Sequence, residues 1–399
     1  MVRKKMKILF PTIAFTHNGG SIYNDLVNCL LEHGHEIVVC RSDDTLESTT
    51  LKKITDKYQI LNIKTGNQFE KNLLKKGINM LFLEKQFVSG IKKYLNNYKF
   101  DLVLYATPPI SLNGVVKYCK KKYNAKSFLM LKDIFPQNAI DLGMIKENSM
   151  IHKFFSNKEK NLYQLSDYIG CMSNKNKEYL NKYSKEILDK SHIFYNSIKI
   201  EDKKEKNGEF KSEYTTFLFG GNIGKPQNIN GLIEIIDDLK SYSKAKFIIV
   251  GKGTEDSTVK EYSRENSINL TYIPYLEKRE YIKLLDSADV GLISLDPRFT
   301  IANIPSKLPT YYNLQKPVLA ITDAYTDLKD MILDEDCGWW CNASNKQEII
   351  DCIKEICESK EKQIQKGLNA FNYAKKYFDV EINVKQIEKF MEENKDESI

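Results

Sequence analysis

Short apolar runs alternate with helix-like stretches along the whole chain. In the first half the runs are "KILF", "EIVVC", "DLVLYA", "SFLMLK", "YIGCM" and "HIFY", and in the second half they are "TTFLFG", "KFIIVG", "LTYIPY", "DVGLISL" and "PVLAIT". Between them apolar residues recur at helical spacing, as over 22–32 and 113–122. Buried strands that alternate with helices are typical of parallel sheets covered on both faces. The pattern predicts an α/β protein.

The strand–helix alternation is interrupted once, by "KKEKNGEFKSE" at Lys203–Glu213. This polar, charged stretch is typical of a linker. A chain of 399 residues exceeds one ordinary core. We therefore expect two doubly wound, Rossmann-like domains, over 1–200 and 201–375, which face each other across a cleft with one substrate on each. The last forty residues have a helical pattern only.

Composition and charge narrow the function classes. The chain is 42% hydrophobic and 28% charged, with a net charge of +7. Residues 1–200 carry 32 Lys/Arg against 18 Asp/Glu, whereas residues 201–399 carry 28 against 35. A basic half favours an acidic membrane surface, a phosphorylated acceptor or nucleic acid as partner. No zinc-finger or RNA-binding aromatic motif accompanies the charge, so nucleic acid is the weakest of the three.

The N-terminus and the cysteines favour a cytoplasmic protein. "MVRKKMKILFPTIAF" imitates a signal peptide, but Pro11 breaks the apolar run and "THNGG" follows, so we interpret Lys7–Phe10 as the first strand. No apolar run approaches the length of a membrane helix. The eight cysteines lack the spacing of a secreted scaffold. The pairs in "CGWWC" and "CIKEIC" offer four zinc ligands, although core cysteines are the better interpretation.

The stretch "FLFGGNIGKPQNINGL", from Phe217 to Leu232, has the order strand, glycine turn, helix. A helix is predicted to begin near Pro226 or Gln227. Gly220, Gly221 and Gly224 let the backbone approach an anion, and Lys225 adds a positive charge. A tight turn without ligand is the structural alternative. A dinucleotide site is disfavoured, because the spacing is G-G-x-x-G and the next strand ends in glycine where a ribose-binding acid is expected.

A second stretch, "LDPRFTIANIPSKLPTYYNLQKPVLAIT", predicts another anion site. Between Asp296 and Asp323 lie 26 residues without one acid. We expect Ser306 to cap a short helix that runs toward Asn313. The candidate ligands are Arg298, Asn303, Ser306 and Lys307. A solvated basic loop is the alternative, but two anion sites in one domain favour a diphosphate and hence a nucleotide sugar.

The N-terminal half offers its own candidates. Gly19 and Gly20 precede the first helix, where a phosphate or an acceptor can approach the backbone. Asp133, in "KDIFPQNAIDLG", ends a strand, which suits an acid or base, although the carboxylate could equally cap the next turn. His17 lies in the first loop, where a surface role is the simpler interpretation.

The segment "FEKNLLKKGINMLFLEKQFVSGIKKYL" mixes lysines with Leu, Phe and Ile. Such a basic amphipathic segment can lie on an anionic membrane, where a lipid-linked acceptor would be found. The alternative is an ordinary helix with a solvated lysine face. The lysines concerned are Lys71, Lys75, Lys76, Lys92 and Lys93.

Taken together, these stretches resemble a known family. The chain is similar over nearly its whole length to the retaining family-four glycosyltransferases of the GT-B fold, and particularly to the bacterial capsule, O-antigen and exopolysaccharide branch. Each motif is weak alone, and their order and spacing carry the resemblance. They are "THNGGSIYNDLVNCLLEHGHEIVV", "LMLKDIFPQNAIDLGMI", "SDYIGCMSNKNKEYL", "FGGNIGKPQNINGLIE", "FIIVGKGTE", "ADVGLISLDPRFTIANIPSKLPTYYNLQKPVLA" and "CGWWC".

The resemblance implies how the two domains are used. It implies a sugar-nucleotide donor in the C-terminal domain and an acceptor on the N-terminal domain. It also implies a last helix, over 376–399, that crosses back to the N-terminal domain, and no required metal. Retention in this fold is thought to occur on one face of the sugar, with the leaving diphosphate helping to deprotonate the acceptor.

Several positions depart from the family pattern. Asn222 and Gln227 stand where many relatives have an Arg and a Lys, and Ala302 and Thr310 stand where most have two Glu. Lys225, Arg298 and Lys307 are the candidate replacements for the cations, and Asp296 is the nearest candidate for the carboxylates. Gln137 stands where relatives often have an acid, which shifts the catalytic role toward Asp133. The departures put the identity of the donor in doubt.

The sequence thus predicts a glycosyltransferase of the hexosyl or N-acetylhexosaminyl type, peripheral on the inner face of the plasma membrane. It would move a sugar, with retention, from a UDP-linked donor to a hydroxyl of a lipid-linked glycan in surface polysaccharide biosynthesis, without a cofactor or metal. The predicted donor-binding residues are Gly19, Gly20, Gly221, Asn222, Lys225, Arg298, Asn303, Ser306 and Lys307, and the predicted catalytic residue is Asp133. The alternatives are a sugar-nucleotide epimerase or hydrolase of the same fold, and a non-catalytic partner of another transferase.

Overall fold

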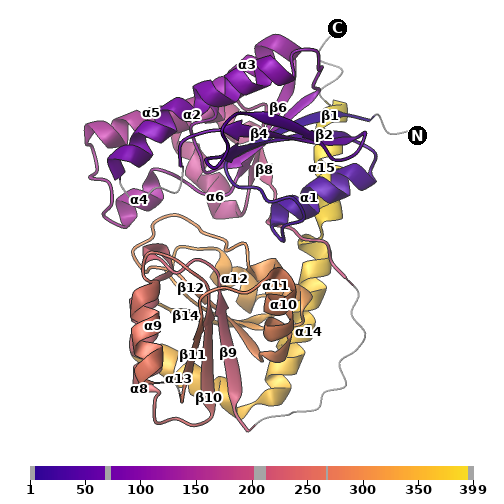
Figure 1. Cartoon of the computed structure of the whole chain (residues 1–399). Coiled ribbons are helices and arrows are strands. Elements are labelled where there is room, and N and C mark those ends of the chain that lie inside the picture. Colours follow the sequence, from indigo (N-terminus) through magenta and orange to yellow (C-terminus); the bar gives the residue numbers. More distant parts are fainter. Residues whose placement is uncertain (1–4, 68–72, 202–212, 267, 394–399) are drawn as a thin grey trace. The chain divides into compact units, whose positions relative to one another are not determined.

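The computed structural model describes residues 5–67, 73–201, 213–266 and 268–393. The chain divides into two compact units (Figure 1). The N-terminal unit comprises Met1–Ile140, Ile145–Tyr195 and Val380–Ile399, and the C-terminal unit comprises Asp141–Met144 and Asn196–Asp379. The predicted linker Lys203–Glu213 lies, apart from Glu213, outside the described residues.

The N-terminal unit is built on one twisted sheet in the order β3-β4-β2-β1-β5-β6-β7-β8. All its neighbours pair in parallel except β3 with β4. Its elements are β1 (Lys7–Thr12), α1 (Ile22–Glu32), β2 (Glu36–Asp43), β3 (Thr50–Lys53), β4 (Tyr58–Lys64), α2 (Leu73–Tyr94), β5 (Leu102–Thr107), α3 (Asn113–Tyr123), β6 (Lys126–Leu131), α4 (Gln137–Asp141), α5 (Met150–Leu165), β7 (Tyr168–Cys171), α6 (Asn174–Tyr179), η1 (Leu180–Lys182), α7 (Lys185–Asp189), β8 (Ser191–Ile193) and α15 (Val380–Glu393).

Helices cover both faces of this sheet (Figure 1). The apolar stripes of α1 and α15 share one core with the strands, through Leu26, Leu30, Val384 and Ile387. Helices α2, α3 and α5 cover the opposite face and pack on one another. Strands buried on both sides need the near-continuous apolar runs that the sequence shows. The strands β3 and β4 are additions that the pattern did not predict.

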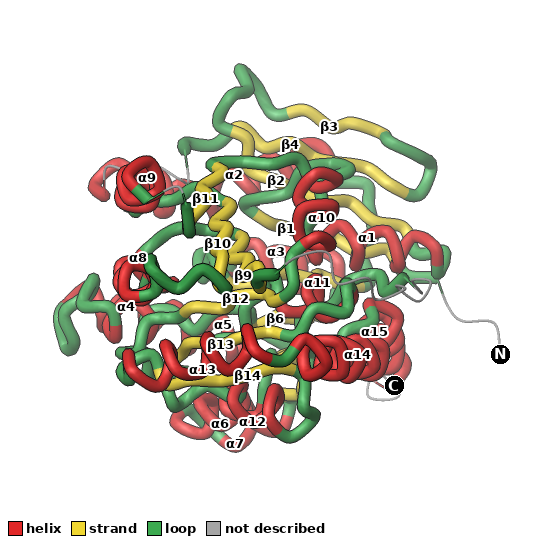
Figure 2. Tube along the Cα trace, turned by 90° about the horizontal axis from the view of Figure 1, so that it is seen from below, coloured by secondary structure: helices red, strands yellow, loops and turns green. Residues whose placement is uncertain are grey.

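The C-terminal unit has an all-parallel sheet in the order β11-β10-β9-β12-β13-β14 (Figure 2). Its elements are β9 (Thr215–Gly220), η2 (Lys225–Gln227), α8 (Ile229–Asp238), β10 (Ala245–Val250), α9 (Asp256–Glu265), β11 (Leu270–Ile273), α10 (Lys278–Ser287), β12 (Val290–Ser294), α11 (Leu308–Asn313), β13 (Val318–Thr322), α12 (Leu328–Leu333), β14 (Gly338–Asn342), α13 (Lys346–Glu358) and α14 (Lys360–Tyr377).

The core of this unit explains two features of its sequence. Helices α8, α9 and α13 lie on one face of the sheet and α10, α11 and α14 on the other (Figures 1 and 2). Ile229, Leu232 and Ile236 of α8 are buried, as their helical spacing predicts, although the α-helix begins at Ile229, after a 3-10 turn. "GWWC" is the sixth strand, β14, and its Cys341 belongs to the core.

Candidate active site

The strand order of the C-terminal unit fixes where a ligand is expected. The order reverses beside β9, whose neighbours are β10 and β12. In open parallel sheets ligands bind at the carboxyl ends of the strands at such a switch point. The glycine turn follows β9 and the acid-free stretch follows β12, so the two predicted anion-binding stretches meet here. The Asp296 N–H donates to the Pro226 carbonyl at 3.0 Å and joins them directly.

Glycines form the surface of the switch point. Gly221 has φ +132° and Gly251, at the end of β10, has φ +153°. The Gly221 N–H donates to the Val250 carbonyl at 2.8 Å, and a Cβ on Gly251 would lie 1.8 Å from the Gly221 oxygen. Only glycine permits this approach of two turns. Gly221 is itself exposed, so a ligand can reach its backbone just after β9.

Lys307 lies directly against this backbone. Its Nζ is 3.6 Å from the centroid of the Phe219 ring, and a Cβ on Gly221 would be 3.4 Å from the same Nζ. Burial lowers the pKa of Lys307 to about 7. Among the described residues no carboxylate forms an ion pair with it. Lys307 is half-buried, and a partly desolvated ammonium without a carboxylate partner among the described residues favours an anionic ligand.

The other predicted cations are arranged differently. Arg298 forms a two-pronged pair with Asp296, at 2.8 Å from Nε to Oδ1 and 2.7 Å from NH2 to Oδ2. The charge of Arg298 is therefore balanced within the loop. The same pair also occupies Asp296, the candidate replacement for the missing Glu residues. Lys225 is exposed at the start of η2. The Asn222 amide donates to the Gln227 oxygen at 3.1 Å, so the two positions that depart from the family pattern bind each other.

In the rest of the second loop, the start of α11 differs from the prediction, and Asn303 provides a buried hydrogen-bond donor. Ser306 is not the N-cap of α11: the helix begins at Leu308, Lys307 occupies the cap position, and no side chain caps it. Pro309 in the first turn removes one N–H that would otherwise need a cap. The Asn303 Nδ2 is buried without a hydrogen-bond partner among the described residues. An unused donor of this kind is costly unless a ligand satisfies it.

In the N-terminal unit the corresponding switch point lies beside β1, between β2 and β5. Asp133 follows β6, the next strand along, and its main-chain oxygen accepts from the Thr107 hydroxyl of β5 at 3.0 Å. Burial raises the pKa of Asp133 to about 6, against the opposing hydrogen bonds from the Ile134 N–H and Asn138. Asn138 donates to Oδ1 at 2.7 Å. These hydrogen bonds order the turn that follows Asp133, and a pKa of about 6 is compatible with the predicted role as an acid or base.

The first loop of this unit is ordered by its own contacts. Gly19 lies in a tight turn in which its N–H donates to the Thr16 carbonyl at 2.9 Å, and a Cβ there would lie 2.8 Å from that oxygen. Ser21 caps α1 in a reciprocal box with Asn24. Gly20 is exposed. The turn itself requires Gly19.

Sequence reasoning missed the residues that hold the site together. Phe219 supplies the ring under Lys307, and the Tyr311 hydroxyl accepts from the Gly220 N–H at 3.2 Å. A Cβ on Gly220 would meet the Tyr281 hydroxyl at 2.2 Å. These aromatic residues have the spacing of core residues, and no signal in the sequence distinguishes them from the rest of the core.

The remaining predicted features, which are the cysteines, His17 and the lysines of α2, lie away from the two anion-binding stretches in the sequence. Cys337 and Cys341 are buried, as the core interpretation predicts, and Cys352 and Cys357 are half-buried. His17 packs beside Tyr58, with ring centroids 5.6 Å apart. Lys92 and Lys93 are exposed on α2; Lys71 lies outside the described residues, as do the side chains of Lys75 and Lys76. Within the described ranges, no helix combines the length and apolar composition needed to span a bilayer.

Comparison with known proteins agrees with this architecture. Residues 200–373 match the family described as "Glycosyl transferases group 1". The chain is 26% identical over 298 residues to the "Probable glycosyltransferase WbjE" of Pseudomonas aeruginosa, covering 72% of this chain and 73% of that protein.

Solved structures show the same fold. Sucrose-phosphate synthase from Thermosynechococcus elongatus has a TM-score of 0.75 at 13% identity, covering 99% of this chain and 100% of that one. Anabaena HepE in complex with UDP-glucose has a TM-score of 0.67 at 13% identity, covering 97% and 100%. The E. coli trehalose-6-phosphate protein bound with UDP-2-fluoro glucose has a TM-score of 0.71 at 9% identity, covering 96% and 99%. The chain therefore has the two-domain GT-B fold and is a glycosyltransferase, and its similarity to the glycosyl transferases group 1 extends over residues 200–373.

Proposed function

We propose that the C-terminal unit binds a nucleoside-diphosphate sugar, and specifically a UDP-linked one, as the donor. The observation that carries this proposal is the Lys307 ammonium, which is partly desolvated against Phe219 and Gly221 and has no carboxylate partner among the described residues. A diphosphate would restore the protonated form of Lys307 and replace the lost hydration. HepE and the trehalose-6-phosphate protein, which share this fold, were solved with UDP-glucose and a UDP-glucose analogue.

The neighbouring groups divide the work of binding. The Asn303 Nδ2 donates to an oxygen of the donor, which satisfies a group that is otherwise buried without a partner. The exposed backbone of Gly221 lets the diphosphate approach the end of β9. Lys225 and Arg298 interact with the donor more weakly than Lys307 does. Lys225 is exposed to solvent, and the charge of Arg298 is balanced by Asp296. They raise the local potential and add less to affinity than Lys307.

The acceptor in this proposal is a hydroxyl of a lipid-linked saccharide, bound by the N-terminal unit. Its support is the positive balance of residues 1–200, at 32 basic against 18 acidic residues, and the exposed lysines at the end of α2. These charges attract an anionic membrane surface on the cytoplasmic side, where such an acceptor is anchored. Surface polysaccharide biosynthesis is the process that uses acceptors of this kind.

The reaction we propose is transfer with retention and without a metal. The bond between the anomeric carbon and the diphosphate breaks, and the acceptor oxygen bonds to the same face of the sugar. The acceptor proton passes to the leaving diphosphate or to Asp133, and Lys307 stabilises the charge that develops on the diphosphate. Positioning and electrostatic stabilisation then supply most of the rate enhancement.

A thermal-shift screen of the full chain against nucleotide sugars tests the donor. A specific donor at about 100 times its Kd stabilises the protein by about 2.7 kcal/mol. We expect UDP and one UDP-sugar to raise the Tm of the wild type, and Lys307→Ala to abolish the rise. Equal shifts in the Lys307→Ala variant would contradict the proposal.

Incubation of the selected donor with lipid extracts distinguishes the reactions. Transfer of label to a lipid-linked product supports the proposed activity. Release of an epimerised or hydrolysed sugar without any acceptor would replace the proposal with a sugar-nucleotide epimerase or hydrolase. Binding of the donor without turnover on any extract would indicate a non-catalytic partner.

A further inference from the structure

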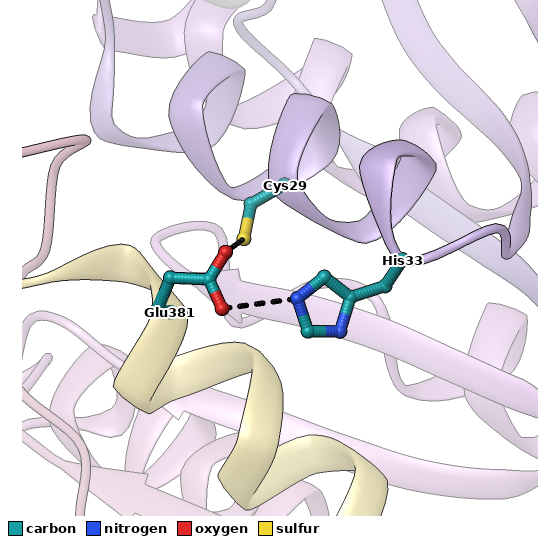
Figure 3. A group of neighbouring side chains, drawn as sticks. All are labelled: Cys29, His33 and Glu381. Carbon is teal, nitrogen blue, oxygen red and sulfur yellow. Dashed lines mark hydrogen bonds and ion pairs between the residues drawn. The ribbon is translucent and has the colours of Figure 1, made fainter. Parts of the chain in front are cut away.

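A cluster of metal-ligating side chains lies in the N-terminal unit, apart from the residues discussed above. Cys29 lies in the last turn of α1, His33 is the C-cap residue of that helix, and Glu381 lies in the first turn of α15 (Figure 3). The Cys29 Sγ is 3.3 Å from Glu381 Oε1, and the His33 Nε2 is 3.0 Å from Glu381 Oε2. The three donor atoms all lie within 4.8 Å of one another.

A second layer of contacts orients the histidine. The His33 Nδ1 is 2.9 Å from Glu388 Oε1, so this ring nitrogen carries a hydrogen and Nε2 points at Glu381 and Cys29. The Glu388 carboxylate is buried, with 7% of its side chain exposed. A carboxylate behind the non-ligating nitrogen is the usual companion of a metal-bound histidine, because it fixes the ring and raises its basicity.

Two groups of candidate metal ligands share His33, and the tautomer of His35 distinguishes between them. His33, His35 and Glu388 also lie close enough to one another to form a group. However, the Met6 N–H donates to His35 Nδ1 at 3.1 Å, so Nδ1 is the acceptor and Nε2 carries the hydrogen. His35 Nε2 lies 3.2 Å from Glu388 Oε1 and donates to it. His35 therefore positions Glu388 and does not itself offer a lone pair to a metal.

We propose that Cys29, His33 and Glu381 bind a zinc ion, with water as the fourth ligand. Thiolate, imidazole and carboxylate are all zinc ligands, and a thiolate selects against magnesium and calcium. A tetrahedral ion with bonds of about 2.0–2.3 Å holds its ligand atoms about 3.4–3.6 Å apart. Cys29 Sγ lies 3.3 Å from Glu381 Oε1 and His33 Nε2 lies 3.0 Å from Oε2. Each ligand atom is therefore within a few tenths of an ångström of this spacing from its own carboxylate oxygen, and a turn of the carboxylate would offer one oxygen to the ion. The Glu381 side chain is 42% exposed, which gives water access to the open position.

Zinc binding would release two protons from the ligands. The Cys29 thiol hydrogen and the hydrogen between His33 Nε2 and Glu381 are released, as metal binding to such ligands requires. The bound ion would join the last turn of α1 to the first turn of α15. Because the last segment of the N-terminal unit begins at Val380, the site would fasten this returning segment at its beginning.

Metal titration of the full-length protein, stripped with a chelator, tests the proposal. We expect one equivalent of Zn²⁺ to bind and to raise the Tm. Co²⁺ in its place should give the visible bands of a tetrahedral site together with a thiolate-to-cobalt charge-transfer band. Because this spectrum is recorded on the wild type, it detects a cysteine thiolate as ligand even if a variant fails to fold. A Co²⁺ complex without the charge-transfer band, or the absence of any one-to-one binding, would overturn the site.

Matched variants assign the ligands. Cys29→Ser should remove the charge-transfer band and weaken Zn²⁺ binding by at least about 100-fold, while Cys352→Ser, a half-buried cysteine of the C-terminal unit, should leave both unchanged. Glu388→Gln should weaken binding by about 10- to 100-fold and retain the band, because it acts through His33. Unchanged zinc affinity in Cys29→Ser, or its loss in Cys352→Ser, would disprove the assignment.

Discussion

Two titratable residues, one in each unit, follow parallel strands at the carboxyl end of a sheet, and both are pushed toward their neutral forms. Asp133 follows β6 and its pKa rises to about 6, whereas Lys307 follows β12 and its pKa falls to about 7. Burial is the main cause in both cases. The carboxyl ends of parallel sheets thus collect groups whose charge is poised near neutral pH.

The two residues differ in what surrounds them. The Asp133 carboxylate is held by Asn138 and the Ile134 N–H, so its position is fixed before any ligand arrives. The Lys307 ammonium lies against the Phe219 ring and near Gly221, and it forms no ion pair with a carboxylate among the described residues. An oriented carboxyl suits proton exchange, and an unpaired ammonium suits the binding of an anion. We therefore propose that Asp133 takes part in proton transfer and that Lys307 binds the diphosphate, and the following experiments test these two roles.

The largest effect is expected from Lys307→Ala. Loss of the group that stabilises the leaving diphosphate should lower kcat/KM by about 10²–10³-fold. Lys354→Ala, an exposed lysine of α13, is the control and should keep full activity. Steady-state transfer assays measure both, with circular dichroism to confirm the fold. Less than a threefold loss in Lys307→Ala would remove Lys307 from the site.

The next effect is expected from Asp133→Asn, at about 10²-fold in kcat. If Asp133 accepts the acceptor proton, the wild-type rate should rise with pH through about 6, where its carboxyl ionises, and the variant should lack this rise. A pH–rate profile measures the change. A variant that keeps the same inflection would show that another group causes it.

Stability provides an independent check on Asp133. Its folded pKa lies above the usual 3.8, so between about pH 4 and 6 the folded state holds a proton that the unfolded state has lost. The free energy of unfolding should therefore fall as pH rises through this window. Asp133→Asn should lack this fall and be at least as stable as the wild type at pH 7, as measured by urea denaturation. A variant clearly less stable at pH 7 would mean that Asp133 has a mainly structural role.

A smaller effect is expected in the pH dependence of donor binding. Above about pH 7 Lys307 is neutral in the free protein, so donor binding must take up a proton. Affinity should fall as pH rises, by at most about tenfold per pH unit, and calorimetry in buffers of different ionisation enthalpy should detect the proton. Lys307→Arg stays charged and should lose this dependence. Equal pH dependence in wild type and Lys307→Arg would assign the titration to another group.

The smallest effect is expected from Gly221→Ala. The residue has φ +132°, and the new Cβ would lie 3.4 Å from Lys307 Nζ. We expect a stability loss of about 1 kcal/mol and a several-fold weaker Kd for the donor. Gly143→Ala is the matched control, because Gly143 also has a positive φ, of +69°, but open space around it. It should lose stability and keep donor affinity; equal affinity losses in both variants would indicate a general effect of strain.

The parts of the fold that could be predicted from the sequence are those with a regular pattern of apolar residues. Apolar runs and helical spacing located most strands and the helices α1, α3 and α8, because both depend on local pattern. The strand β3 was missed because it is a short, largely exposed edge strand without an apolar run, whereas β4, which pairs in parallel with β2, has apolar residues interrupted by Gln59 and Asn62. The strand β14 was not predicted, because the two cysteines of "CGWWC" were interpreted as a candidate zinc-ligand pair or as core residues. The N-cap of α11 was misplaced by one residue, since capping depends on backbone angles.

For the site, the sequence by itself determined which stretches matter, and only the tertiary structure decided what each charge does. Glycine spacing and an acid-free run of residues are properties of the chain, and they marked the loops after β9 and β12 before any contact was known. The partners of a charge are not local: Arg298 is occupied by Asp296, Asn222 by Gln227, and Lys307 by no carboxylate among the described residues. Cys29 meets Glu381 across 352 positions of sequence. Sequence spacing limits side-chain contacts only within a few residues, so pairings of this range depend on how the elements pack.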